Sequence, residues 1–274
     1  SKHTGALSFQ DAWLGVLSYT LQLYFDFSGY SDMAIGLSRL FGIKLPLNFN
    51  SPYKSTSMID FWNRWHMTLS QFLREYLYFT LGGNKLGKTR RLINMMITMV
   101  LGGLWHGAGW TFIVWGSLHG IFLVTNHLFR EAFPIPKTPA KQWHATVRSA
   151  AGWVITSLAV VASMAVFRAT SLSDAIVILQ AMAGIASDAA PPIAKIVDHA
   201  DDGWNMVLWI SLIALFAPNT QEIMSKFNPA WDTVSSNTRW QWRPHPALAI
   251  LAGLALGLSI VNIGQVSEFL YFQF

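Results

Sequence analysis

Five apolar stretches separated by polar segments form the main pattern along the 274-residue chain. They cover residues 12–35, 92–128, 150–167, 204–217 and 247–263. A helix needs roughly 20 apolar residues to cross a hydrocarbon core of about 30 Å. The stretch at 204–217 is short for that distance, so it would need a tilt or a thinned bilayer. The pattern predicts an all-α integral membrane protein built as a multispan helical bundle.

Charges in the polar segments predict how the stretches are oriented. Residues 81–91 and 129–149 are both basic, so we expect both on the cytoplasmic side. Residues 168–203 are acidic and are expected outside. The stretch at 92–128 must then enter and leave through one face, which predicts two spans or a re-entrant pair. The cations of the first segment are Lys85, Lys88, Arg90 and Arg91.

The middle of this stretch holds a polar, titratable side chain. Residues 102–110 read GGLWHGAGW and place His106 between tryptophans and glycines, beside Trp105. We expect this glycine-rich turn to lie deep in the membrane. Non-helical backbone is tolerated there only where protein buries it or a water-filled cavity reaches it.

A second histidine occurs in an amphipathic segment. Residues 57–77 contain no Pro or Gly, and Ser57 stands three residues before Asp60 in a capping-box-like start. One helical face is apolar and the other polar, with His66 at the margin. The segment predicts one helix that lies at the membrane interface or lines a cavity. A purely structural histidine at such a boundary is the alternative.

Two carboxylates lie inside the apolar stretch at 12–35. A lone charge at bilayer depth costs at least ~2.5 kcal/mol, so Asp26 and Asp32 should face protein or water and be paired. Arg64 and Arg74 are available partners. The alternative is that the acids only join helices by hydrogen bonds.

Composition excludes several classes of protein. The chain is 52% hydrophobic and only 12% charged, with thirteen Trp and no Cys. A soluble domain carries roughly twice that charge. The net charge of +5 lacks basic clusters with interleaved aromatics, so no nucleic-acid partner is expected. No His-Glu-x-x-His, phosphate-binding Gly-rich loop or Gly-x-Ser-x-Gly motif occurs, so no metal site is expected either.

Four motifs occur in a fixed order. They read DFSGYSDMAIG at residues 26–36, NFNSPY at 48–53, FWNRWHMTLSQFLREYLYFTLGG at 61–83 and GGLWHGAGWTFIVWGSLHG at 102–120. Together they resemble the membrane-bound O-acyltransferase (MBOAT) family. The resemblance is to its bacterial branch, with the alginate O-acetyltransferase (AlgI-like) membrane subunit and the D-alanyl transfer protein of teichoic acid modification.

The resemblance implies an activity, a location and partners. It implies acyl transfer from a cytoplasmic thioester such as acetyl-CoA to a hydroxyl of an extracellular polysaccharide, with no tightly bound cofactor. Alginate, cellulose and peptidoglycan stay open as acceptors. A bacterial inner membrane location, several passes through the lipid bilayer and an extracytoplasmic acetyltransferase partner are expected. The fold it implies has re-entrant or interfacial helices around a buried tunnel.

The resemblance also implies the catalytic residues. The family's essential histidine maps onto His106, and its second, more variable histidine maps onto His66. A neutral imidazole suits a general base on the acceptor hydroxyl, which is the role expected for His106. Gly107 and Gly109 would let backbone approach closely. His66 would orient substrate or relay a proton.

The acyl donor needs a site of its own. Coenzyme A carries phosphates, so the cations of residues 81–91 are a candidate cytoplasmic rim for acetyl-CoA. Positive-inside anchoring explains the same cations without a ligand.

The competing function is a proton-coupled transporter or channel subunit, in which Asp26, Asp32 and His106 would form a path for protons or ions. The stretches after residue 150 contain almost no titratable groups, which favours the enzyme.

The chain is expected to be the C-terminal portion of a longer protein. It begins with Ser without a leader, and members of the family have more spans than the stretches found here. Residues 267–274, SEFLYFQF, resemble the end of alginate-type members. We expect one membrane domain over 1–274, with the catalytic motifs within 11–128 and C-terminal transmembrane helices within 150–264.

Overall fold

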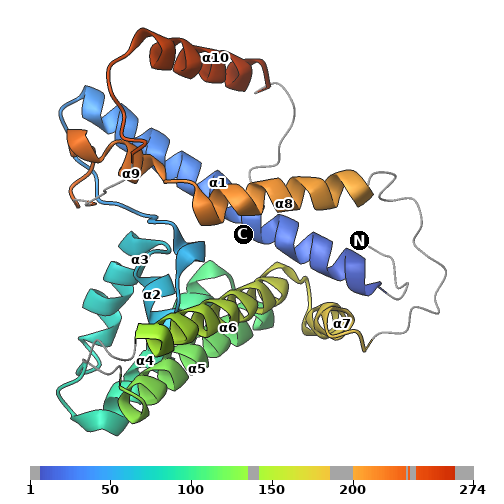
Figure 1. Ribbon diagram of the computed structural model, residues 1–274. Helices are drawn as coiled ribbons and strands as arrows, with labels where there is room; N and C mark the ends of the chain where they lie inside the picture. The colour runs from blue at the N-terminus through green and yellow to red at the C-terminus, as the bar shows by residue number, and fades with distance from the viewer. Residues whose placement is uncertain (1–6, 135–141, 186–199, 233, 235–238, 263–274) are drawn as a thin grey trace. The chain divides into compact units, whose positions relative to one another are not determined.

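The computed structural model describes residues 7–134, 142–185, 200–232, 234 and 239–262 (Figure 1). Over these residues the chain is helical and contains no strand, which confirms the predicted all-α class. The elements are α1 Phe9–Leu40, η1 Pro52–Lys54, α2 Met58–Trp62, α3 Met67–Phe72, η2 Leu73–Tyr78, α4 Gly87–His106, α5 Trp110–Ala132, α6 Gln142–Arg168, α7 Leu172–Met182, α8 Ala200–Phe216, α9 Thr220–Ile223, η4 Ser225–Phe227 and α10 Pro246–Asn262.

The chain divides into two compact units. Unit 1 comprises Ser1–Phe25 and Asn48–Ala217, and unit 2 comprises Asp26–Leu47 and Pro218–Phe274. All the candidate catalytic and donor-binding residues belong to unit 1. The catalytic region at 11–128 and the C-terminal helices at 150–264 were predicted from motifs and apolar stretches, whereas the two units are defined by contacts in the structure. The predicted division stays a prediction.

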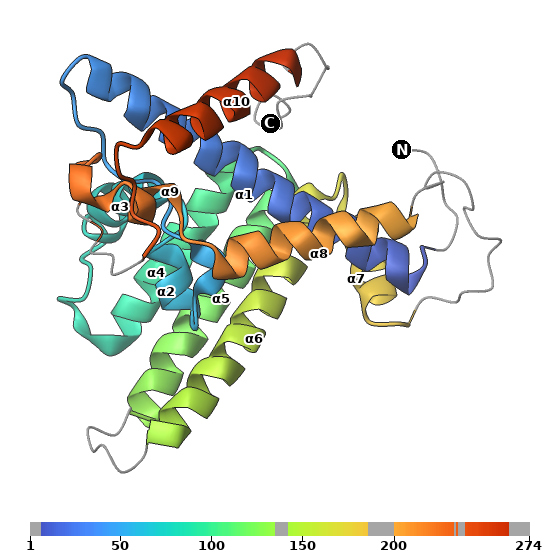
Figure 2. The same cartoon turned by 45° about the horizontal axis from the view of Figure 1, so that its top comes forward.

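The helices α4 and α5 form the hairpin predicted for residues 92–128. The helix α4 ends at His106 and α5 begins at Trp110, so the glycine-rich turn is three residues long. In both views α4, α5 and α6 run side by side (Figure 1, Figure 2). The two-legged hairpin is therefore confirmed, whereas its depth in a membrane and a surrounding tunnel stay predictions.

Glycines bring the backbones of α4 and α5 into direct contact. A Cβ on Gly103 would lie 2.2 Å from the carbonyl oxygen of Phe112, and one on Gly116 would lie 2.4 Å from that of Met99. Real Cβ atoms do not approach carbonyl oxygens so closely, so any side chain here would push the helices apart. Small residues at helix contacts are typical of membrane bundles, where packing replaces the hydrophobic effect.

The predicted single helix over residues 57–77 is wrong. The Ser57 hydroxyl accepts the backbone N–H of Asp60 at 3.1 Å, so the predicted cap is confirmed. However, α2 ends at Trp62, and His66 adopts a left-handed conformation with φ of 43° before α3 begins. The π-helical segment η2 then completes the region.

The neighbouring segment around Asn48 and Asn50, which has no regular secondary structure, explains the break. The Asn50 N–H donates to the carbonyl of Arg64 at 3.0 Å, and the Met67 N–H donates to the carbonyl of Asn48 at 2.9 Å. These bonds satisfy backbone groups that a continuous helix would have satisfied internally. The pairing partner lies outside the segment itself, so helical periodicity alone could not reveal the break.

In unit 2, loop contacts join its two segments, which are far apart in the sequence. The Trp231 N–H donates to the carbonyl of Leu45 at 2.9 Å, and the Asp232 carboxylate accepts the Leu47 N–H at 3.1 Å. The helix α9 starts with a complete capping box formed by Asn219 and Glu222. These contacts fix the loop that follows α9 onto the segment that follows α1.

Two described helices are long and apolar enough to cross a membrane. They are α5, Trp110–Ala132, and the part of α6 at Ala145–Arg168. The helices α7, α8 and α10 are apolar but shorter. The spans predicted at residues 12–35, 204–217 and 247–263 therefore stay predictions.

The Gly116→Ala variant tests the backbone contact. Its methyl group would overpack the hairpin, and overpacking costs about 1–3 kcal/mol, so the unfolding temperature should fall. The matched control is Gly15→Ala in α1, where nothing lies within 4 Å of an added Cβ. Thermal unfolding in detergent should show the control unchanged or slightly more stable. Equal unfolding temperatures for Gly116→Ala and the parent would contradict the packing argument.

Candidate functional site

His106 lies at the end of α4 inside a set of aromatic rings. Its ring centroid is 5.0 Å from Trp105, 5.3 Å from Trp115 and 5.1 Å from Phe167, in edge-to-face arrangements. The histidine is half-buried, and within the described part of the chain no hydrogen bond engages its ring. The helices α4, α5 and α6 thus combine to hold His106 by packing.

Gly107 makes room for one of the neighbouring rings. A Cβ at this position would lie 2.5 Å from the Phe112 ring, so a side chain would displace that ring. The ring of Phe112 in turn packs edge-on against Phe167 at 5.2 Å. The space beside Gly107 is therefore filled by the protein's own aromatic side chain. The role expected for this glycine, close approach of backbone to substrate, stays a prediction.

His66 reaches the same site from the connection between α2 and α3. Its ring lies edge-on to Trp105 with 6.5 Å between centroids, and Trp105 also contacts His106. The Nδ1 atom of His66 is 3.0 Å from Oδ1 of Asn48. The structure thus brings together His66, His106 and Trp105, all three predicted from the sequence.

Burial controls the charge of His66, which lies between the apolar stretches of the sequence. Removal from water is the largest effect and lowers the pKa of the ring to about 4, and a charge on His106 lowers it further. The two histidines are thus close enough for one charge to oppose the other. His66 is neutral at neutral pH.

His119 is a packed residue of α5. It is fully buried, and its Nδ1 accepts the Trp62 indole N–H at 3.2 Å. The proton of the neutral ring must then reside on Nε2, which donates to Ser163 Oγ at 2.9 Å. Ser163 donates onward to the carbonyl of Val160 at 2.7 Å. These hydrogen bonds join α2, α5 and α6 and leave each ring nitrogen of His119 with a partner.

The candidate donor-binding cations lie around the start of α4. Lys88 and Arg91 are on its first turns and both pair with Glu131 at the end of α5, Lys88 at 2.5 Å. Among the described residues, Lys85 and Arg90 form no ion pair. Glu131 is an acid within the basic segment 129–149, so the sequence provided no reason to expect it as the partner of these cations.

Arg64 and Asp32 contact residues other than their predicted partners. Arg64 pairs with Asp60 one turn earlier at 2.8 Å, and the Asp32 carboxylate accepts the Gln221 amide at 2.6 Å. Asp26 and Asp32 belong to unit 2, whereas Arg64 and the exposed Arg74 belong to unit 1. Pairing between the two sets stays a prediction.

Four residues of the site were not named as site residues from the sequence: Asn48, Phe112, Trp115 and Phe167. Asn48 falls in the NFNSPY motif, which was the only signal for it.

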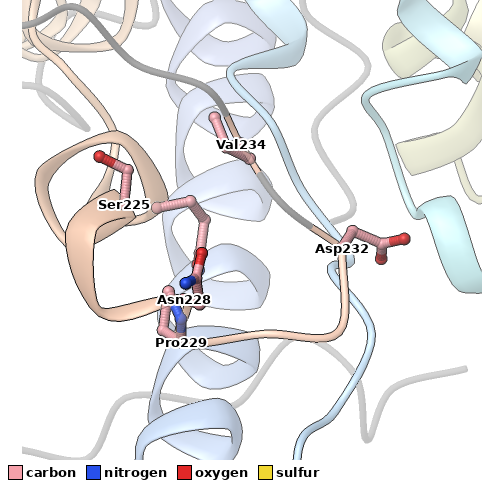
Figure 3. A pocket seen from close by; sticks show the side chains of 6 residues that line it. Ser225, Asn228, Pro229, Asp232 and Val234 are labelled. Atoms are coloured by element: carbon pink, nitrogen blue, oxygen red, sulfur yellow. The ribbon is translucent and has the colours of Figure 1, made fainter.

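In the described residues, no group of three or more His, Asp or Glu side chains is arranged to hold a metal ion. A small, shallow pocket in unit 2 contains no predicted site residue (Figure 3). Its lining is Gln221, Ser225, Asn228, Pro229, Asp232 and Val234.

A family model matches most of unit 1. The model for the membrane-bound O-acyltransferases covers residues 6–167, more than half of the 274 residues. The chain belongs to the MBOAT family. This confirms the resemblance drawn from the four motifs and identifies the protein as a member of a membrane-bound family.

Relatives within the MBOAT family act on different acceptors, according to their names. The peptidoglycan O-acetyltransferase of Helicobacter pylori is 36% identical over 285 residues, which cover 98% of this chain and 50% of that protein. The probable alginate O-acetylase of Azotobacter vinelandii is 53% identical over 146 residues, 53% of this chain and 29% of that protein. The teichoic acid D-alanyltransferase of Streptococcus thermophilus is 44% identical over 121 residues, 41% and 29% respectively. The chain spans about half the length of these relatives, or less.

The His119→Leu variant tests the buried hydrogen-bond chain. The substitution leaves the Trp62 indole and the Ser163 hydroxyl without their partner, so we expect a loss of about 2–4 kcal/mol in stability. His127→Leu, at a half-buried position near the end of the same helix, is the matched control. Thermal unfolding of both proteins in detergent measures the difference. A His119 variant as stable as the control would show that the chain contributes little.

Proposed function

We propose that the chain forms the catalytic part of a multi-pass O-acyltransferase in a bacterial inner membrane. The enzyme transfers an acetyl group from a thioester such as acetyl-CoA to a hydroxyl of an extracytoplasmic polysaccharide. The observation that carries this proposal is the meeting of His66 and His106 at Trp105, in an aromatic site at the turn of the α4–α5 hairpin. Two relatives named as O-acetylating proteins support acetyl as the transferred group.

His106 acts as the general base in the proposed reaction. Its ring nitrogen takes the proton of the acceptor hydroxyl while the oxygen attacks the thioester carbonyl. The carbon–sulfur bond breaks, and the departing thiolate takes the proton back from the imidazolium. The products are an acetyl ester and a free thiol, and His106 returns to its neutral form.

The aromatic surroundings support this role for His106. Trp115 and Phe167 contact the imidazole edge to face, which shields those sides of the ring from water and limits its rotation. A fixed ring reduces the entropy lost when the acceptor hydroxyl is aligned with the thioester. No described residue forms a hydrogen bond to the ring, so none of them competes with the acceptor hydroxyl for its lone pair.

The donor enters from the side where both ends of the hairpin lie. Lys85, Lys88, Arg90 and Arg91 would receive the phosphates of coenzyme A there. Glu131 competes for two of these cations, so Lys85 and Arg90 carry more of the proposed binding. The acceptor polysaccharide and an extracytoplasmic acetyltransferase partner would meet the enzyme from the opposite side.

The His106→Gln variant tests the base. Glutamine cannot take up the proton, so acetyl transfer by the full-length protein in membranes should fall by at least about 10²-fold. His245→Gln, at an exposed position in unit 2, is the control and should retain transfer. The assay follows labelled acetyl from the thioester to polysaccharide, with protein amount measured in the same membranes. Transfer by His106→Gln at the control rate would overturn the proposed role.

The donor rim makes an opposite pair of predictions for acetyl-CoA affinity. The Lys85→Glu, Arg90→Glu double variant removes two cations and should weaken binding, whereas Glu131→Gln releases Lys88 and Arg91 and should tighten it. Each change should be up to about fivefold, the range expected for exposed charge pairs. Equilibrium binding to the full-length protein in detergent measures both. Unchanged affinity in both variants would contradict the proposed donor binding and leave membrane anchoring as the explanation for these cations.

A further inference from the structure

The Asn48 side chain is the centre of a small polar cluster beside His66. Its Oδ1 lies 2.9 Å from Thr68 Oγ1, 3.4 Å from the Thr68 backbone nitrogen and 3.0 Å from Nδ1 of His66. A backbone N–H can only donate a hydrogen bond, so the atom facing it must be the amide oxygen. The orientation of the Asn48 amide is therefore determined by its neighbours.

This orientation determines the tautomer of His66. An amide oxygen only accepts hydrogen bonds, so the Nδ1 atom of His66 must carry the proton it donates. A neutral imidazole has a single N–H, which places the lone pair of His66 on Nε2. Burial keeps the ring in this neutral form.

The same asparagine also holds the backbone on which His66 is mounted. Its carbonyl accepts the Met67 N–H at 2.9 Å, next to the left-handed conformation of His66. Left-handed backbone at a residue other than glycine is sparsely populated and persists only where surrounding contacts impose it. Asn48 thus fixes both the position of the His66 ring and the location of its proton.

The partner of Nδ1 also limits what His66 can do chemically. In a catalytic triad a carboxylate stabilises the imidazolium that forms when histidine takes a proton. Here the partner is a neutral amide, and the titratable group that faces His66 from α4 is another histidine, His106. A neutral amide stabilises a positive charge on His66 less than a carboxylate would, and a charge on His106 opposes it.

The geometry points to Asn48 as a positioning residue that presents Nε2 of His66 as a hydrogen-bond acceptor for the acceptor hydroxyl. This inference rests on the proposed acyl transfer. His66 orients the hydroxyl through that hydrogen bond, and His106 removes the proton. Of the two roles that the sequence left open for His66, orientation is the one the contacts favour.

Histidine nitrogen NMR on the full-length protein tests the tautomer without any activity measurement. With ¹⁵N-labelled histidine, and His66 assigned by its absence from the His66→Gln spectrum, Nδ1 should show the protonated signal and Nε2 the lone-pair signal. The Asn48→Leu variant should mix the two tautomers. The Asn126→Leu control removes another amide oxygen that accepts a backbone N–H, from Ile59, and should leave His66 unchanged.

Asn48→Asp keeps the inference testable if Asn48→Leu does not fold. The carboxylate still accepts from Nδ1, so the tautomer should be retained, while the added negative charge should raise the pKa of His66. A lone pair on Nδ1 in the parent, or an unchanged His66 spectrum in a folded Asn48→Leu protein, would overturn the inference.

Activity separates orientation from proton transfer. The Oε1 atom of glutamine can accept a hydrogen bond but not a proton, so His66→Gln should keep transfer within about tenfold of the parent, whereas His66→Phe should lose at least about 10²-fold. Equal loss in both variants would overturn the orienting role. If the unmodified full-length protein transfers no acetyl group, the proposed function is wrong. The NMR measurement of the His66 tautomer does not depend on that result.

Discussion

Direct backbone contact between α4 and α5 is the constraint on which the candidate site depends. Gly103 and Gly116 leave no room for side chains between the helices, so the two legs approach closely and a three-residue turn can join them. That turn sets His106 at the end of one leg. The rings of Phe112 and Trp115, on the first turns of the other leg, then fall beside it. The hairpin thus creates the aromatic site by its close packing.

A second constraint is the segment that includes Asn48 and Asn50. Left-handed backbone at His66 costs about 1–2 kcal/mol, and each hydrogen bond to this segment returns about 0.5–1.5 kcal/mol. Two backbone bonds and the bonds to the Asn48 side chain are sufficient to offset the cost. The break between α2 and α3 is therefore stable. It places the His66 ring against Trp105, whereas a continuous helix would have placed His66 at the margin of its apolar face.

These two constraints differ in how far the sequence revealed them. The hairpin could be predicted because its signals are local: two apolar legs, a glycine-rich turn and basic flanks. The Ser57 cap could be predicted for the same reason. The break at His66 could not, since residues 57–77 contain no Pro or Gly and the hydrogen bonds that impose it come from Asn48 and Asn50. Resemblance to a family supplied both histidines, but only the structure supplied the residue that orients one of them.

The charges at the open end of the hairpin lead to one further conclusion about topology. Cations at the start of α4 and an acid at the end of α5 both oppose the helix dipoles, which favour the reverse arrangement. Both helix ends lie on one side of the hairpin, so Lys88 and Arg91 can pair with Glu131. These ion pairs offset the unfavourable interaction of each charge with its own helix dipole. Helix stability therefore does not explain why the cations are placed here. Their location on one side of the hairpin is typical of residues that orient a protein in a membrane. The proposed anionic donor would use the same cations, two of which pair with Glu131 among the described residues.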